Sequence, residues 1–285
     1  MKKYPVINIF LFFITILTTL IAGYWQENCS GFLELVKNPF LLYKGIPFSF
    51  TLILILGAHE LGHYLTAKKH GVEATPPFFI PSPHPLVGTF GAFIRMKSPV
   101  PNRKALLDIA VAGPLSGFLI ALPAVIIGIK LSEIQTSHIV NEVTPWCQVT
   151  VGSSLLISFL TKTLLGPLPS SYLVSFHPIA FAAWIGLFVT ALNLIPLGQL
   201  DGGHIIYAIV TKRYKTVNKI SFFLLLLLGI LWQGWFFWAL IIFLFGFRHP
   251  SLIEELSPLD LKRKVIGAIT IIIFLITFIP IPFIV

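Results

Sequence analysis

The chain has 285 residues, of which 56% are hydrophobic and only 11% are charged, and its formal net charge is +9. This composition excludes an ordinary soluble domain and is typical of a chain that crosses a membrane several times. Basic loops on the cytoplasmic side of such a protein explain the positive charge, so we expect a lipid bilayer and no nucleic acid as its partner.

Apolar segments recur along the chain and predict an all-α polytopic membrane protein with about 6–7 transmembrane segments. The first segment, 6–23, is long enough to span and is not followed by a small-residue cleavage site, so we expect a retained span. The other expected spans are residues 47–69, 105–130, 177–196, 220–247 and 265–284. Residues 1–285 are expected to form a single integral membrane domain, because no soluble stretch is long enough for another one.

Residues 220–247 can be one tilted span or a hairpin of two short helices, because Trp232-Gln233-Gly234-Trp235 interrupts them. A hairpin with a cytoplasmic N-terminus places sixteen Lys and Arg residues on the inner side and four on the outer side. A single span gives twelve and eight. The hairpin is favoured, since Lys and Arg accumulate on the cytoplasmic side. Each arm is then shorter than the about 20 residues of a full crossing.

A His-Glu-x-x-His pattern, at His59, Glu60 and His63, lies at the far end of the second apolar segment. Residues four apart lie on the same face of a helix, so both imidazoles can bind one metal ion while Glu60 lies beside them. Zinc proteases use this arrangement, in which a carboxylate takes a proton from water. The alternative is a pair of core histidines bonded to backbone carbonyls, which would leave Glu60 buried without a partner.

The connection between the second and third apolar segments, residues 71–103, is rich in proline, which disfavours helix. Within it, residues 88–96 alternate small, β-branched and aromatic side chains, so we expect a small membrane-associated β element near residues 86–97. Small residues in 110–117 predict that another helix packs closely on the third span. Asp108 near the start of that span is expected to be stabilised by the helix dipole.

A catalytic zinc site needs a third protein ligand from elsewhere in the chain. The expected topology brings residues 193–201 to the same depth as the two histidines, and two glycines after Asp201 let the backbone turn or approach closely there. Asp201 is therefore the best candidate. Glu254, Glu255 and Asp260 lie on the same side, in a polar stretch more easily explained as solvated surface.

Two segments together resemble the site-2 protease family of intramembrane zinc metalloproteases: Gly57–His63 (GAHELGH) and Asn193–Gly202 (NLIPLGQLDG). Gly88–Ile94 and Ala112–Gly117 also resemble segments of the bacterial and chloroplast members that lack a PDZ domain. On this resemblance, the catalytic core is expected at about residues 47–250, and the spans 6–23 and 265–284 are peripheral. Many members have a proline where this chain has Leu194, a difference that removes no chemical group.

The resemblance implies an intramembrane zinc metalloendopeptidase that cleaves transmembrane proteins or peptides near the cytoplasmic face. It implies one zinc ion per chain on His59, His63 and Asp201, and a general base and acid at Glu60. Asn193 would hydrogen-bond the substrate backbone or the developing oxyanion. The substrate, once unwound, would pair with the strand edge of Gly88, Thr89, Phe90, Gly91, Ala92 and Phe93. By the same resemblance, we expect a bacterial inner (plasma) membrane as its location, with an organelle membrane as the alternative.

Two other functions are compatible with the sequence. One is a membrane zincin of another class, with a glutamate such as Glu254 as third ligand. The other is a non-enzymatic transporter or binder of membrane segments. The intact Glu60 argues against the second, since a pure binder needs no base beside two metal ligands. A disulfide between Cys29 and Cys147, a metal-supporting role for His204, the oligomeric state and the substrate all stay open.

Overall fold

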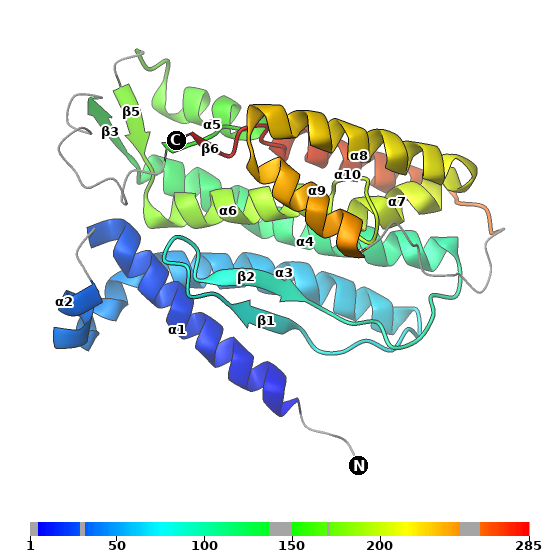
Figure 1. Ribbon diagram of the computed structural model, residues 1–285, viewed down its shortest axis with the longest axis horizontal. Helices are drawn as coiled ribbons and strands as arrows, with labels where there is room; N and C mark the ends of the chain where they lie inside the picture. Colours follow the sequence, from blue (N-terminus) through cyan, green and yellow to red (C-terminus); the bar gives the residue numbers. More distant parts are fainter. Residues whose placement is uncertain (1–4, 29–31, 137–149, 170–171, 246–256, 285) are drawn as a thin grey trace.

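The computed structural model describes residues 5–28, 32–136, 150–169, 172–245 and 257–284, which form a mostly helical fold with three two-stranded sheets (Figure 1). Cys29 and Cys147 lie outside these ranges, so their predicted alternatives are not tested. The elements in chain order are α1 (Val6–Asn28), α2 (Phe32–Lys37), the 3-10 helix η1 (Pro39–Gly45), α3 (Ile46–Lys69), β1 (Phe78–Pro81), β2 (Thr89–Phe93), α4 (Arg103–Lys130), β3 (Glu133–Thr136), β4 (Thr150–Val151), α5 (Leu155–Leu165), β5 (Tyr172–Ser175), α6 (Pro178–Asn193), α7 (Asp201–Val210), the 3-10 helix η4 (Thr211–Arg213), α8 (Tyr214–Leu231), α9 (Gly234–Phe245), α10 (Leu261–Thr277) and β6 (Phe283–Ile284).

Four helical stretches of the described residues are long and apolar enough to cross a membrane: Val6–Gln26, Pro39–Lys69, Arg103–Lys130 and Asp201–Leu231. The predicted number of about 6–7 transmembrane segments is therefore not confirmed. α6 has only 16 residues, about 24 Å of helix, which is shorter than the ~30 Å hydrocarbon core. α10 has 17 residues, and the chain beyond it leaves the helix where Pro280 and Pro282 could not continue it.

α3, α4 and α6 form the centre of the molecule, and α4 packs against both of the others (Figure 1). Their close approach depends on glycines. A Cβ on Gly62 of α3 would lie 2.5 Å from the Ala112 carbonyl oxygen of α4. A Cβ on Gly186 of α6 would lie 2.7 Å from Ile55 Cγ2 of α3. The close helix packing predicted for residues 110–117 is confirmed.

The predicted hairpin in residues 220–247 is formed by α8 and α9. α8 ends at Leu231 and α9 begins at Gly234, and the rings of Phe222 and Phe243 lie 6.4 Å apart, so α9 folds back along α8. α9 has 12 residues, which is too short for a full crossing of a bilayer. Trp235 Nε1–H donates a hydrogen bond of 2.7 Å to the Pro280 carbonyl oxygen, which ties the hairpin to the C-terminal segment.

The predicted β element is an antiparallel hairpin of β1 and β2, in which Phe78 lies opposite Phe93. An isolated bridge between Ala74 and Met96 extends it toward the end of α3. β1 contacts α1 and β2 contacts α3, so the hairpin lies along both helices (Figure 1). The sequence indicated β2 but not its partner, because β1 is hidden in the proline-rich connection.

Asp108 joins three helices at the end where α3 finishes. Its Oδ1 and Oδ2 accept hydrogen bonds from Nε and Nη2 of Arg263 in α10, at 2.9 and 2.7 Å. Its Oδ2 also lies 3.0 Å from Nε2 of His70, the residue after α3. The prediction that the helix dipole stabilises Asp108 therefore omits the main contacts of this residue, which are made by residues distant in the sequence.

Candidate active site

α3 brings His59 and His63 together, as the four-residue spacing predicts. The two residues are 4% and 7% exposed, and their Nε2 atoms lie 3.1 Å apart. Both imidazoles thus direct one nitrogen to the same point inside the protein.

Asp201, the first residue of α7, completes a cluster of three side chains. Its Oδ2 lies 3.2 Å from Nε2 of His59 and 3.2 Å from Nε2 of His63. Tetrahedral zinc with bonds of about 2.0–2.1 Å separates its ligand atoms by roughly 3.3 Å, so this triangle has the size that zinc requires. Within the described ranges, no other group of three His, Cys, Asp or Glu side chains is close enough to bind a metal ion.

A hydrogen bond to α4 fixes the orientation of the His63 ring. His63 Nδ1–H donates to the Ile109 carbonyl oxygen at 2.8 Å, so the Nε2 lone pair faces His59 and Asp201. The alternative of core histidines correctly includes a backbone carbonyl partner for His63. It does not explain why the Nε2 atoms of both rings converge on a carboxylate.

Glu60 is 6% exposed and lies next to the ligand cluster on α3. The backbone N–H of Ile94, the residue after β2, lies near the Glu60 carboxylate. The β hairpin therefore reaches the side chain that is expected to act as general base. No local sequence pattern indicates this contact, since the two residues belong to different elements.

Asn193 is the last residue of α6, and its Nδ2 lies 3.4 Å from His59 Nε2. Its amide is thus at the edge of the ligand cluster. The two glycines after Asp201 provide the close approach predicted for them. A Cβ on Gly202 would overlap the Leu194 carbonyl oxygen, so α7 begins directly against the chain that precedes it.

Of the other acidic candidates, the structure describes only Asp260, and Asp260 does not join the cluster. Asp260 caps α10 and forms an ion pair with Arg263. Glu254 and Glu255 lie outside the described residues. His204 is 8% exposed, and it is not part of the group that could hold a metal ion.

Phe90 and Gly91 give β2 an irregular, accessible segment. Phe90 is 73% exposed and has no partner in β1, because Ile80 pairs with Gly91 and Pro81 with Thr89. Gly91 has φ +102°, and nothing lies within 4 Å of the position that a Cβ would occupy. A chain segment can therefore approach this part of the strand.

Gly88 has another role at the start of the strand. Its N–H donates to the His84 carbonyl oxygen, and its own carbonyl oxygen accepts from the Ser82 N–H. The same oxygen accepts a 2.6 Å hydrogen bond from Thr18 Oγ1 of α1. Gly88, at φ +73°, forms the turn that fastens the hairpin to α1.

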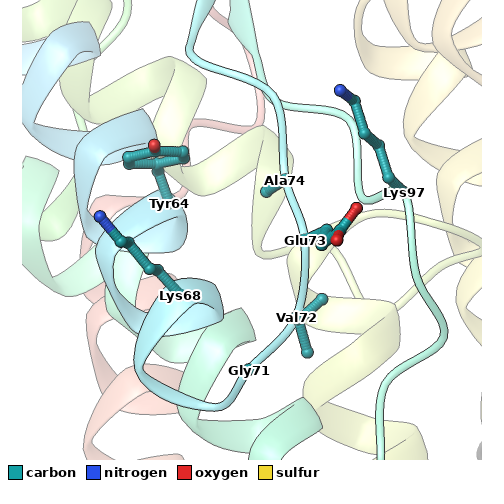
Figure 2. Close-up of a pocket in the computed structure, with 7 residues that line it drawn as sticks. All are labelled: Tyr64, Lys68, Gly71, Val72, Glu73, Ala74 and Lys97. Carbon is teal, nitrogen blue, oxygen red and sulfur yellow. The ribbon is translucent and has the colours of Figure 1, made fainter. Parts of the chain in front are cut away.

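A hollow of about 340 Å³ lies beyond Glu60, between α3 and the chain that follows it. Figure 2 shows Tyr64 and Lys68 on the α3 wall, with Glu73 and Lys97 on the facing chain. Tyr64 is four residues after Glu60 and Lys68 four after that, so the hollow continues the side of α3 that carries Glu60.

Comparison with known proteins identifies relatives that match most of this chain. Residues 47–229 match the family model of peptidase family M50. The probable zinc metalloprotease EGY2, chloroplastic, of Arabidopsis thaliana is 34% identical over 258 residues, which cover 89% of this chain and 45% of that protein. EGY1 of the same plant is 29% identical over 240 residues (83% and 43%). EGY3 of Oryza sativa subsp. indica is 28% identical over 280 residues (92% and 45%).

The chain spans about half the length of the curated relatives that it matches. These relatives are named as chloroplastic proteins, so they do not support the expected location in a bacterial plasma membrane. The apolar helices, in a chain similar to membrane proteases, indicate an integral membrane protein. The matched range includes both histidines, Glu60, Asn193 and Asp201, and the chain belongs to peptidase family M50, the site-2 protease family.

Proposed function

We propose that this chain is an intramembrane zinc metalloendopeptidase that cleaves a transmembrane protein or peptide near the membrane face at which α3 ends. The observation that carries the proposal is the convergence of His59, His63 and Asp201 beside the buried Glu60. Two imidazoles and one carboxylate are a donor set of catalytic zinc sites, and three protein ligands leave the fourth position for water. We therefore assign one zinc ion to each chain.

Zinc, when bound, supplies Lewis acidity and lowers the pKa of a bound water to about 7. The Glu60 carboxylate accepts the proton of the attacking water and then donates it to the nitrogen of the leaving amine, so that the C–N bond breaks after the C–O bond has formed. The Ile94 N–H lies near this carboxylate. Asn193 donates from Nδ2 to the carbonyl oxygen of the scissile bond, where negative charge develops.

The substrate is proposed to bind as an added strand along residues 88–93. A helical peptide bond is shielded by its own hydrogen bonds, so the substrate must unwind, and an extended chain gains main-chain bonds by pairing with a strand edge. Thr89–Phe93 provide the edge and Gly88 the turn that holds it. Support comes from the exposed Phe90 and from Ile94, which links the end of the strand to Glu60. The hollow at Tyr64 and Lys68 would receive the segment beyond the cleaved bond (Figure 2).

The face at which α3 ends is proposed to be the cytoplasmic side, together with the N-terminus. Lys68 and Lys69 end α3, and Arg103 and Lys104 begin α4, so four cations lie where these two spans reach the same face. Such an excess of Lys and Arg marks the cytoplasmic side of a membrane protein.

Cleavage of model transmembrane peptides by detergent-purified protein tests the proposal, with bound zinc measured in the same samples. Glu60→Gln should retain zinc and lose cleavage by about 100-fold or more, because it removes the base and leaves the ligands intact. Chelation should stop cleavage by the wild type. Glu133→Gln, at the opposite end of α4, should behave as wild type. Equal cleavage by wild type and Glu60→Gln would contradict the proposal.

A further inference from the structure

We infer that Asn218 and Tyr214 of α8 are positioning residues that hold the loop between α6 and α7 and thereby set the place of Asp201. The inference rests on the proposed metal site. It assigns a role in zinc binding to two side chains that do not themselves contact the ligand cluster.

Both backbone polar groups of Gly198, in the middle of this loop, are bonded to α8. The Gly198 N–H donates to Asn218 Oδ1 at 3.2 Å, and Tyr214 OH donates to the Gly198 carbonyl oxygen at 3.2 Å. Asn218 Nδ2 donates to Tyr214 OH at 3.2 Å, which closes the network. Two side chains one helical turn apart therefore bond to both the N–H and the carbonyl oxygen of Gly198.

The network is buried and specific to this loop. Asn218 and Tyr214 are each 4% exposed, so water cannot readily replace the bonds if one is removed. Gly198 has φ +54°, a left-handed conformation that glycine adopts without the cost to other residues. The loop is thus held in a tight turn by groups from another helix and not by its sequence alone.

The two ends of the loop carry the groups that meet at His59. Asn193 ends α6, with Nδ2 3.4 Å from His59 Nε2, and Asp201 begins α7, with Oδ2 3.2 Å from the same nitrogen. Metal–ligand distances tolerate errors of only about 0.2 Å. A small displacement of the loop would therefore weaken metal binding.

The start of α7 transmits any such displacement directly. A Cβ on Gly203 would overlap the Gly198 carbonyl oxygen, so the first turn of α7 packs directly against Gly198. A shift of Gly198 must move this turn, and Asp201 with it. Asn218 and Tyr214 are thus linked to the third ligand through the backbone of Gly198, and Tyr214 also contacts the ring of Tyr207 in α7.

The experiment measures the zinc dissociation constant of the full chain by chelator competition, with the unfolding temperature of the metal-free protein. Tyr214→Phe removes one hydroxyl, and Asn218→Leu removes the amide at similar size. Each should weaken zinc binding about 10–100-fold, as loss of groups that orient metal ligands does. The double variant should lose less than the product of the two single losses, because both residues act on the same loop.

Thr277→Val is the matched control, since Thr277 is fully buried and bonds only to carbonyls of its own helix. It should lower the unfolding temperature and leave zinc affinity within about twofold of wild type. Wild-type affinity in both α8 variants, or an equal loss in the control, would overturn the inference. Asp201→Ala, measured alongside, distinguishes failure of the inference about Asn218 and Tyr214 from failure of the metal site. Wild-type zinc affinity in Asp201→Ala would contradict the proposed function itself.

Discussion

Glycines of α4 provide the space in which the two histidines lie. A Cβ on Gly113 would overlap the imidazole of His63. A Cβ on Gly117 would lie 3.3 Å from His59 Nδ1, a tight contact that a small shift relieves. The geometry of the ligand cluster therefore depends on glycine at position 113 much more than at position 117.

Gly113→Ala should displace the His63 ring and reduce bound zinc at least about 10-fold, because the ring cannot keep both its Ile109 bond and its place in the cluster. Gly117→Ala, one turn further along the same helix, should keep most of its zinc. Metal analysis of the purified variants measures this. Full zinc content in Gly113→Ala would show that the ring is not confined as described.

At the residue scale, the sequence predicted the groups that carry a local signal. The four-residue spacing of His59 and His63 and the glycines after Asp201 are such signals, and the structure brings the three side chains together. Ile109, Ile94 and Asn218 could not be predicted, because each acts through a contact between elements that are distant in the sequence.

At the scale of elements, β2 links substrate binding to the catalytic side chain. Its irregular pairing at Phe90 depends on the positive φ of Gly91, and the Ile94 N–H just beyond its end lies near the Glu60 carboxylate. A change in the shape of β2 should therefore affect substrate use without touching the metal ligands.

Gly91→Ala tests this role against Gly166→Ala, a control with similar backbone strain just after α5. Both glycines have positive φ, +102° and +80°, and open space around a Cβ, so each variant should lose about 1–2 kcal/mol of stability. Only Gly91→Ala should raise the KM for a transmembrane peptide, by several-fold, at nearly unchanged zinc content. A similar KM change in Gly166→Ala would assign the effect to general stability.

Element prediction succeeded where apolar length or alternation is a local property, as in α1, α3, α4 and β2. Where packing decides, the expected spans are not confirmed. α6 is too short to be counted as a span, yet most of its residues are buried between neighbouring helices. The last expected span ends at Thr277, because two closely spaced prolines turn the remaining apolar residues into an extended segment.

At the scale of the whole molecule, α10 is held to the core at both of its ends. Arg263 near its start is bonded to Asp108 of α4. Beyond its end, the Pro280 carbonyl accepts from Trp235, and β6 pairs with β4. The C-terminal region, which the resemblance suggested to be peripheral, thus packs against α4 and α6.

Arg263→Ala should lower the free energy of unfolding by about 1–2 kcal/mol, because it removes two charge-assisted hydrogen bonds from a partly buried carboxylate. Lys262→Ala, an exposed neighbour, should change it by less than about 0.5 kcal/mol. Denaturant unfolding in detergent measures both. Equal stability of the two variants would mean that the Asp108 contacts contribute nothing to holding α10.

The zinc content of purified protein shows whether His59, His63 and Asp201 hold one zinc ion. Wild type should contain about one zinc per chain, Asp201→Ala should contain little, and Asp260→Ala should match wild type, because Asp260 is bonded to Arg263 at the start of α10. Zinc retained in Asp201→Ala, or absent from the wild type, would contradict the account.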